Sequence, residues 1–475
     1  MSAVKLNKSE IKDKVYACWI GKNIGGTIGG PYENAHDFLD IKGFSTEPGD
    51  PLPNDDLDLQ LMWLIALEKE GPFNFDSRTL AEYWALGIDP NWNEYGTGKA
   101  NLFDGIMPPL SGELNNDYWK NSNGAWIRSE IWACLTPGYP QIARQYAYAD
   151  AVVDHGLNEG TYAELFTTTM QSLAFFNNDI EEIIKESLKV IPQDSRLAKS
   201  INFVIEEFHK GTPYRQVRDM LIELNSDMGW FQAPSNVGFV IIGLLYGEKD
   251  FKKSLIYTVN CADDADCTAG TVGATLGILL GTKGIPEDWV TYIGDDIKTI
   301  CINAHYRRIV PKTCQELTER VISMIPFVLK SKGLELEWTD GENEFQPLKK
   351  FRDFTANISK RSKWTFDLPH VPHAYAYGEY SSKPQLKEGE QIKISLKVTN
   401  LGVRSSNFKV TVLLPDGWSA DYEKSFHIAT FGDLASNKWE ATITAGKTES
   451  INHVVVICDA SVQAQPIIAD FVIKG

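Results

Sequence analysis

A stripe of small residues between positions 265 and 281 is the feature that most constrains the fold of this chain. Small residues recur there every four positions, at Ala265, Ala269, Gly273, Gly277 and Gly281. In a helix this spacing places them along one face, where the backbone of another helix could approach closely. Glycine inside a helix costs up to about 1 kcal/mol per residue, so a packing role is expected. We therefore predict a central, buried helix that begins near Asp263.

The sequence before about Pro326 has the pattern of successive helices. Asn7 and Glu10 form a predicted N-cap pair, and apolar residues follow them at helical spacing. Further helices are predicted after Pro53 and across residues 239–244. This part of the chain is therefore expected to be all-α.

The periodicity changes near residue 365. Apolar and polar residues alternate across 392–398 and again across 408–414, as in half-buried strands. A region of about 110 residues with several short strands is typical of a small antiparallel sandwich. We predict a mainly α chain, with an orthogonal all-α domain over 1–330, a bridge over 331–364 and an Ig-like β-sandwich over 365–475.

Charge and composition narrow the classes of partner. The 475 residues are 43% hydrophobic and carry a net charge of −17, which argues against nucleic acid or an acidic membrane as the default partner. The start of the sequence has no secretory signal, and no apolar stretch reaches the roughly 18–20 residues of a membrane helix. The seven cysteines show no CxxC pairing, as expected in a reducing compartment. These features predict a cytoplasmic protein.

Two acidic segments concentrate the candidate chemistry. Asn54, Asp55, Asp56 and Asp58 open the helix after Pro53. Carboxylates in a first helical turn are stabilised by about 0.3–1 kcal/mol each through the helix dipole, so a purely capping role is an open alternative for this segment.

The second segment is harder to explain by capping alone. Asp263, Asp264 and Asp266 lie at the start of the predicted buried helix, where they would repel one another and where burial would raise their pKa values. A hard divalent cation with oxygen ligands relieves both effects. The two acidic helix starts together predict one shared metal site.

Five short motifs, spread over roughly residues 10–285, resemble those of ADP-ribosylglycohydrolases and occur in the same order. Residues 20–33 resemble the family's opening Gly-rich helix, which ends in a glutamate. The others are Asn54-Asp55-Asp56 for Thr-Asp-Asp, 123–128 for Asn-Gly-x-x-Met-Arg, Asp154-His155 for Thr-His, and 264–269 for Asp-Thr-Asp-Thr-Asn-Ala.

The resemblance implies an all-α fold with two magnesium ions between helix ends and cleavage of the bond between a ribose anomeric carbon and an amino-acid side chain. It places Glu33 at the mouth of the site and implies catalytic roles for Glu33, Asp55 and Asp266. Asn123, Gly124 and His155 are the implied substrate-binding residues, although a structural role for His155 is an open alternative. The implied metal ligands are Asn54, Asp55, Asp56, Asp264, Asp266 and Cys267.

Two positions depart from the family's pattern. Asn54 replaces a threonine, and its amide oxygen can still ligate a hard cation. Cys267 also replaces a threonine, and its soft sulfur suits magnesium poorly. The sequence therefore leaves open whether one or two Mg²⁺ ions, or another divalent cation, are bound, and whether Asp58 or Asp263 contributes.

Aromatic residues between 84 and 139 provide candidate stacking surfaces. Most are expected to pack in the core. Trp92 and Tyr95 lie in a polar, loop-like stretch, and we predict that they line the substrate cleft, because aromatic faces stack on sugar rings or on adenine. The Gly-rich run at 20–33 has no preceding strand and no Gly-Lys-Ser/Thr ending, so close helix packing is a better explanation for it than a phosphate loop.

The leading hypothesis is a metal-dependent glycohydrolase that cleaves the ribosyl anomeric bond of ADP-ribosylated or related substrates. Two alternatives are a glycosidase acting on a non-nucleotide furanosyl substrate and a non-catalytic relative. The expected partner is a free or protein-linked glycoside such as ADP-ribose, with no nucleic acid and no membrane. The sequence leaves the aglycone, the role of the sandwich and a homo-oligomeric state open.

Overall fold

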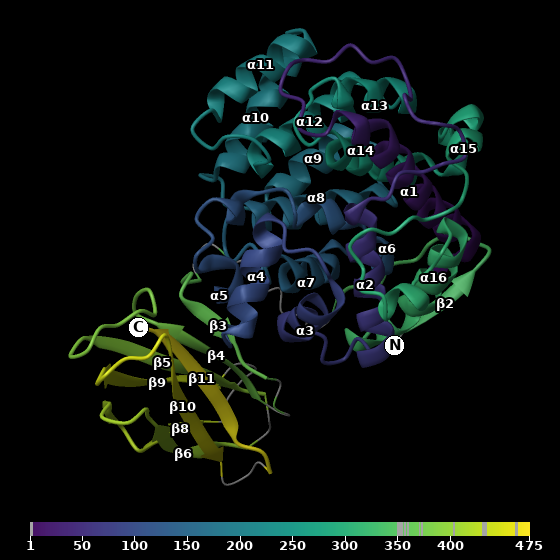
Figure 1. Cartoon of the computed structure of the whole chain (residues 1–475). Coiled ribbons are helices and arrows are strands. Elements are labelled where there is room, and N and C mark those ends of the chain that lie inside the picture. The colour runs from purple at the N-terminus through teal and green to yellow at the C-terminus, as the bar shows by residue number, and fades with distance from the viewer. Residues whose placement is uncertain are drawn as a thin grey trace.

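A computed structural model of the chain describes residues 3–348, 355, 358, 361–369, 371, 374–401, 404–429, 435–460 and 464–475. Helices occupy the first part and antiparallel sheets the last, so the predicted mainly α architecture with an added β domain is confirmed (Figure 1). The helices are α1 Lys8–Gly29, α2 Asp55–Glu70, α3 Ser77–Gly87, α4 Asn93–Phe103, α5 Leu110–Glu113, α6 Glu130–Leu135, α7 Pro140–Ala151, α8 Glu159–Ala174, α9 Ile180–Leu188, α10 Arg196–His209, α11 Tyr214–Leu224, α12 Ala233–Tyr246, α13 Phe251–Val259, α14 Ala265–Leu280, α15 Glu287–Ile293 and α16 Cys314–Ser331.

Helices α1 and α14 pack backbone against backbone at the centre of the helical part. A Cβ atom added to Gly21 would lie 2.1 Å from the carbonyl oxygen of Gly273, and one added to Gly25 would lie 2.2 Å from that of Ala269. The predicted close approach along the small-residue stripe is therefore confirmed. The two helices run antiparallel, because Gly29 at the end of α1 meets Ala265 at the start of α14.

Helix starts follow the capping signals of the sequence. Asn7 accepts a hydrogen bond from the backbone N–H of Glu10 (3.1 Å), as predicted.

Within the described residues, no helix combines the length and the apolar character needed to cross a bilayer.

The strands form one small parallel pair and two antiparallel sheets. One sheet has the strand order β11-β10-β6-β8 and the other β3-β4-β5-β9-β7. Apolar residues from both sheets form one core, with Ile394 and Leu396 from one and Val454 and Val456 from the other. The strands are β1 Val4–Asn7, β2 Leu336–Thr339, β3 Thr365–Asp367, β4 Ala374–Tyr380, β5 Gln391–Asn400, β6 Ser406–Leu413, β7 Ser419–Tyr422, β8 Ser425–Ile428, β9 Ala435–Thr444, β10 Ile451–Ala460 and β11 Ile467–Lys474.

Strand pairing and apolar packing both connect the parts of the chain. β1 pairs in parallel with β2, so the predicted bridge returns to the N-terminal strand before it reaches the sandwich. Ile106, Leu110 and Leu114, around α5, pack into the core of the sandwich. The division at 330 and 364 stays a prediction, and residues 349–354, 356–357 and 359–360 of the bridge lie outside the described residues.

Candidate active site

The antiparallel packing of α1 and α14 brings two acidic segments to the same end of the helix pair. Helix α1 ends at Gly29 and is followed by a short turn, Gly30–Tyr32, that leads to Glu33. Helix α14 begins at Ala265, so Asp264 and Asp266 lie at its start. The stripe of small residues that packs the core therefore also positions these three carboxylates.

A strained turn fixes the start of α14 against the segment after Glu33. Ala262 and Asp263 both have positive φ angles, 65° and 64°, which are unfavourable for residues other than glycine. The turn is held by two backbone hydrogen bonds, Asp263 N–H to Ala35 O (2.7 Å) and Asn34 N–H to Asp263 O (3.0 Å). These bonds hold the Glu33 loop beside the helix start.

The carboxylates of Glu33, Asp264 and Asp266 form a compact group. Their ligand oxygens lie within 4.8 Å of one another. Asp266 is 8% exposed, and its Oδ1 has no hydrogen-bond partner. Burial, followed by repulsion from neighbouring carboxylates, raises the pKa values of Asp264 and Asp266. Asn123 Nδ2 donates to Asp264 Oδ2 (2.7 Å).

The start of α2 completes the acidic site. Asp55 accepts a hydrogen bond from the Tyr95 hydroxyl (2.6 Å) and lines the cavity. Burial and the adjacent Asp56 raise the pKa of Asp55 to about 6. Asn54 does not line the cavity, because its Oδ1 accepts from the N–H of Asp56 (2.7 Å) and so caps the helix.

Asp56 lies behind the cavity wall beside a buried lysine. Lys22 Nζ, from α1, is 3.0 Å from Asp56 Oδ2, and the thiol of Cys267 donates to Asp56 Oδ1 (3.1 Å). Lys22 also pairs with Glu130 (3.1 Å). The contact between Lys22 and Asp56 is an ion pair, since Asp56 Oδ2 receives no well-angled hydrogen bond. Burial opposes the charge on Lys22, but the carboxylates of Asp56 and Glu130 outweigh it and raise the lysine pKa.

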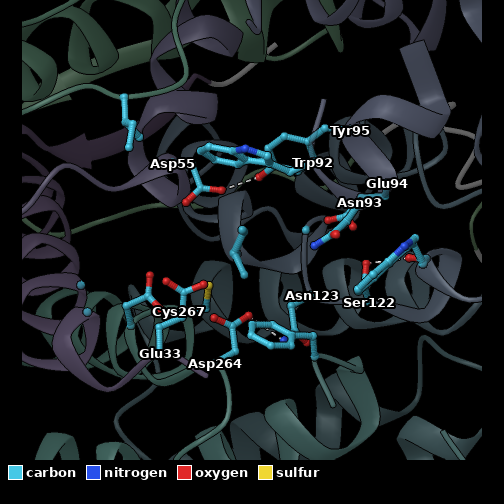
Figure 2. Close-up of a pocket in the computed structure, with 18 of the residues that line it drawn as sticks. Glu33, Asp55, Trp92, Asn93, Glu94, Tyr95, Ser122, Asn123, Asp264 and Cys267 are labelled. Atoms are coloured by element: carbon cyan, nitrogen blue, oxygen red, sulfur yellow. Dashed lines mark hydrogen bonds between the residues drawn. The ribbon is translucent and has the colours of Figure 1, made fainter. Parts of the chain in front are cut away.

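The carboxylates of Glu33, Asp55, Asp264 and Asp266 line a cavity of about 610 Å³ (Figure 2). Figure 2 shows Glu33, Asp264 and Cys267 on one side of the cavity and Glu94 and Ser122 on another. The ring of Trp92 lies near Asp55 and Tyr95. The lining residues are Gly26, Gly30, Glu33, Leu52, Pro53, Asp55, Trp92, Asn93, Glu94, Tyr95, Trp119, Ser122, Asn123, Gly124, Ile127, Phe231, Asp264, Asp266, Cys267 and Ile300.

Most of the predicted site residues meet in this cavity, but three do not line it. Asn54 and Asp56 lie behind the wall, and His155 is fully buried between Asp154 (2.9 Å) and Ser122 (3.1 Å). His155 therefore contacts the lining of the cavity through the Ser122 hydroxyl. Trp92, which is 47% exposed, and Tyr95 both line the cavity.

Asp58 and Asp263, which the sequence left open as extra ligands, have structural partners instead. Asp58 accepts from the backbone N–H groups of Ile300 and Cys301, both at 2.6 Å. Asp263 accepts from Asn236 Nδ2 (2.8 Å). Neither residue lines the cavity.

Glu94 is a cavity residue that sequence reasoning missed. It is 5% exposed, and its Oε2 has no hydrogen-bond partner. Burial raises its pKa to about 7. Its position between Trp92 and Tyr95, at the start of α4, was the available signal. Lys22 was missed as well, although a lysine flanked by Ile20 and Ile24 in an apolar helix is an unusual placement.

The three-carboxylate group suits a hard divalent cation. Oxygen ligands clustered at this spacing are what Mg²⁺ and Ca²⁺ prefer, and the unpartnered Oδ1 of Asp266 is free to ligate. A second group, Asp56, Asp266 and Cys267, also has its ligand atoms within 4.8 Å. This second set fits less well, because it contains a thiol and lies against the ammonium of Lys22.

Solved structures with similarity to the chain include one described as an ADP-ribosylglycohydrolase-related protein complex. It is 17% identical, with a TM-score of 0.47, across 67% of this chain and 99% of that one. A FixG-related protein from Vibrio parahaemolyticus is 13% identical, with a TM-score of 0.19, across 22% of this chain and 97% of that one. A search of the curated proteins gives no match.

The family comparison covers the helical part and contains the whole candidate site. The sequence model of the ADP-ribosylglycohydrolase family matches residues 7–319, about two thirds of the chain. This range includes all the residues that line the cavity. The chain belongs to the ADP-ribosylglycohydrolase family.

Proposed function

We propose that this chain is a metal-dependent glycohydrolase that cleaves the anomeric bond of a ribosyl or related furanosyl group. The observation that carries the proposal is the group of Glu33, Asp264 and Asp266 at the wall of the cavity, with one buried oxygen lacking any partner. When bound there, a divalent cation would supply a positive charge that orients sugar hydroxyls and a water.

The other catalytic roles are assigned to residues of the chain. Glycoside cleavage passes through an oxocarbenium-like state and uses a pair of carboxyl groups. Asp55, with a pKa raised to about 6, can hold or release a proton near neutral pH and is assigned proton transfer, and Glu33 is assigned to assist it as a ligand of the cation. Asp266 contributes negative charge beside the developing cation. Trp92 and Tyr95 offer aromatic faces to the substrate.

Asn123 and Gly124 are assigned to substrate positioning. Asn123 is oriented by two contacts, since its Nδ2 donates to Asp264 and its Oδ1 accepts from Trp126 Nε1 (3.1 Å). Gly124 leaves space for Glu94, because a Cβ atom there would lie 2.0 Å from Glu94 Oε1. His155 is assigned an indirect role, in which it positions the Ser122 hydroxyl.

A second candidate substrate, a neutral furanoside, is favoured by the charge of the cavity. Its described lining contains Glu33, Asp55, Glu94, Asp264 and Asp266 but no lysine, arginine or histidine. The diphosphate of ADP-ribose would meet these carboxylates without a cationic side chain in the lining to bind it. A non-nucleotide sugar avoids this repulsion.

The experiment compares both substrate classes with and without metal. ADP-ribosylated arginine and serine peptides are incubated beside a panel of aryl furanosides, in Mg²⁺ and in a chelator. Activity is expected only with the metal, and Asp55→Asn should lower kcat by about 10²–10⁴-fold. Asp117→Asn is the matched control, because Asp117 is 97% exposed and does not line the cavity.

Each outcome decides one part of the proposal. Cleavage of furanosides alone would rule out the ADP-ribosyl substrate and support the second candidate. Full activity in the chelator, or full activity of Asp55→Asn, would refute the proposed mechanism. An absence of activity on every substrate, together with an absence of cation binding, would favour a non-catalytic relative.

A further inference from the structure

The acidic residues at the cavity form two overlapping groups that share Asp266. One contains Glu33 and Asp264, and the other contains Asp56 and Cys267. The spacing of the ligand atoms alone would therefore allow two neighbouring cations. The surroundings of the two groups differ.

The second group already contains a cation from the chain itself. Lys22 is 1% exposed, and its Nζ donates to Ile127 O (2.6 Å) and to Glu130 Oε1 (3.1 Å) while it pairs with Asp56 Oδ2 (3.0 Å). A third, longer hydrogen bond from Nζ to Thr271 Oγ1 (3.5 Å) uses the last of the three donors of the ammonium. The charge is fixed beside Asp56.

The packing of α14 holds the lysine in this position. A Cβ atom added to Gly270 would lie 3.2 Å from Lys22 Cδ and 3.4 Å from its Cε. The stem of the lysine therefore runs along the bare backbone at Gly270. Glu130 is anchored in turn by Gln60 Nε2 (2.9 Å) and Gln171 Nε2 (3.2 Å). This network leaves the ammonium little freedom to move away from Asp56.

Cys267 occupies the other oxygen of Asp56. Its Sγ lies 3.1 Å from Asp56 Oδ1, and a soft sulfur is a poor ligand for a hard cation. Lys22 Nζ is 3.0 Å from Asp56 Oδ2. With metal–oxygen distances of roughly 2.0–2.6 Å, a divalent cation on that oxygen would lie no more than about 5.6 Å from Nζ, and the like charges would repel. The first group, by contrast, faces a cavity whose described lining contains no lysine, arginine or histidine.

We propose that the centre binds a single divalent cation, held by Glu33, Asp264 and Asp266, and that the ammonium of Lys22 takes the place of a second cation beside Asp56. The inference rests on the proposed metal dependence. It goes beyond it by assigning the number of ions and a fixed, protein-supplied charge at the second position.

The test counts Mn²⁺ ions per chain by calorimetry and by electron paramagnetic resonance. The full-length protein is expected to bind one Mn²⁺ with the spectrum of an isolated ion. Two ions about 3.5–4 Å apart, the usual spacing of two-metal sites, would give a spin-coupled spectrum. Two ions in the unmodified chain overturn the inference, and no ion at all refutes the proposed metal dependence as well.

Variants identify which group excludes the second ion. Lys22→Met keeps an unbranched apolar stem and removes the charge, so it is expected to bind two Mn²⁺. Cys267→Thr alone is expected to bind one, because Lys22 remains. Two ions in Cys267→Thr would show that the sulfur excludes the second ion and would overturn the assignment to Lys22.

A matched control separates this effect from the loss of any buried lysine. Lys99 is also buried, and its Nζ donates to the carbonyl oxygens of Ile88 (2.9 Å), Asp89 (3.1 Å) and Pro90 (2.5 Å), away from the acidic group. Lys99→Met is expected to keep one ion. Circular dichroism checks that each variant is folded, and the count in the unmodified chain tests the inference even if Lys22→Met does not fold.

Discussion

Replacing Gly273 by alanine tests whether backbone contact between α1 and α14 holds the helical part together. Helix propensity alone predicts a gain, because alanine is favoured over glycine by about 1 kcal/mol in a helix interior. The structure predicts the opposite. A Cβ atom at Gly273 would lie 2.1 Å from Gly21 O, 2.8 Å from its carbonyl carbon and 3.4 Å from its Cα.

The size of the loss follows from what must move. Ordinary carbon–oxygen contacts need more than 3 Å, and the obstructing atoms belong to the backbone, so no side-chain rotation relieves the clash. Overpacking of a core typically costs about 1–3 kcal/mol and sometimes more. Because two main chains must separate, we expect the upper end, about 3 kcal/mol, net of the propensity gain.

Urea unfolding followed by circular dichroism measures the change, with Gly43→Ala as the control. A Cβ atom at Gly43 meets nothing within 4 Å, so its free energy of unfolding should change by less than about 0.5 kcal/mol. Ala269→Gly should cost more than about 1 kcal/mol, because it loses helix propensity and also a buried methyl group. A Gly273→Ala variant as stable as the parent, or more stable, would refute the close backbone packing.

Three further perturbations test other parts of the structure. Burial raises the pKa of Glu94 to about 7. The contribution of Glu94 to the free energy of unfolding is therefore complete below about pH 4.5 and falls by up to about 3 kcal/mol as the pH rises to 7. Glu94→Gln should flatten this part of the pH profile of stability, measured by urea unfolding. Arg128→Met removes the guanidinium that pairs with the buried Asp150 and Asp154 and should lower the free energy of unfolding by about 3–5 kcal/mol, so an unchanged denaturation midpoint would contradict the role of this ion-pair network. Trp92→Ala should raise KM with little change in the melting temperature, since the ring is 47% exposed at the cavity; an unchanged KM would remove Trp92 from the substrate surface.

The fold was predictable because periodicity records which faces are buried. The four-residue stripe on α14 predicted a closely packed helix, and alternating apolar residues predicted strands β5 and β6. The partner of α14 could have been found as well, since Gly21, Gly25 and Gly29 repeat the same spacing on α1. The pairing of β1 with β2 was not predicted, because two four-residue strands more than 300 positions apart carry no local signal.

The residues of the site could be predicted from the sequence, but not which of their side chains face the cavity. Sequence motifs selected Glu33, Asp264 and Asp266, which the structure brings together. They also selected Asn54, whose amide instead caps α2, because an asparagine before a helix can either cap it or ligate a cation. Residue type fixes the available chemistry, whereas the neighbours that compete for each oxygen are set by the tertiary fold.

The contact between α1 and α14 also determines when the site can form during synthesis. About 235 residues separate Gly29 from Ala265, and ribosomes add roughly 5–20 residues per second, so α1 is made roughly 10–50 s before its partner. Throughout that interval the face of α1 that ends up against α14 has no native partner. A nascent chain halted before residue 264 would lack both Asp264 and Asp266, so the proposed cation site cannot form until the start of α14 has been synthesised.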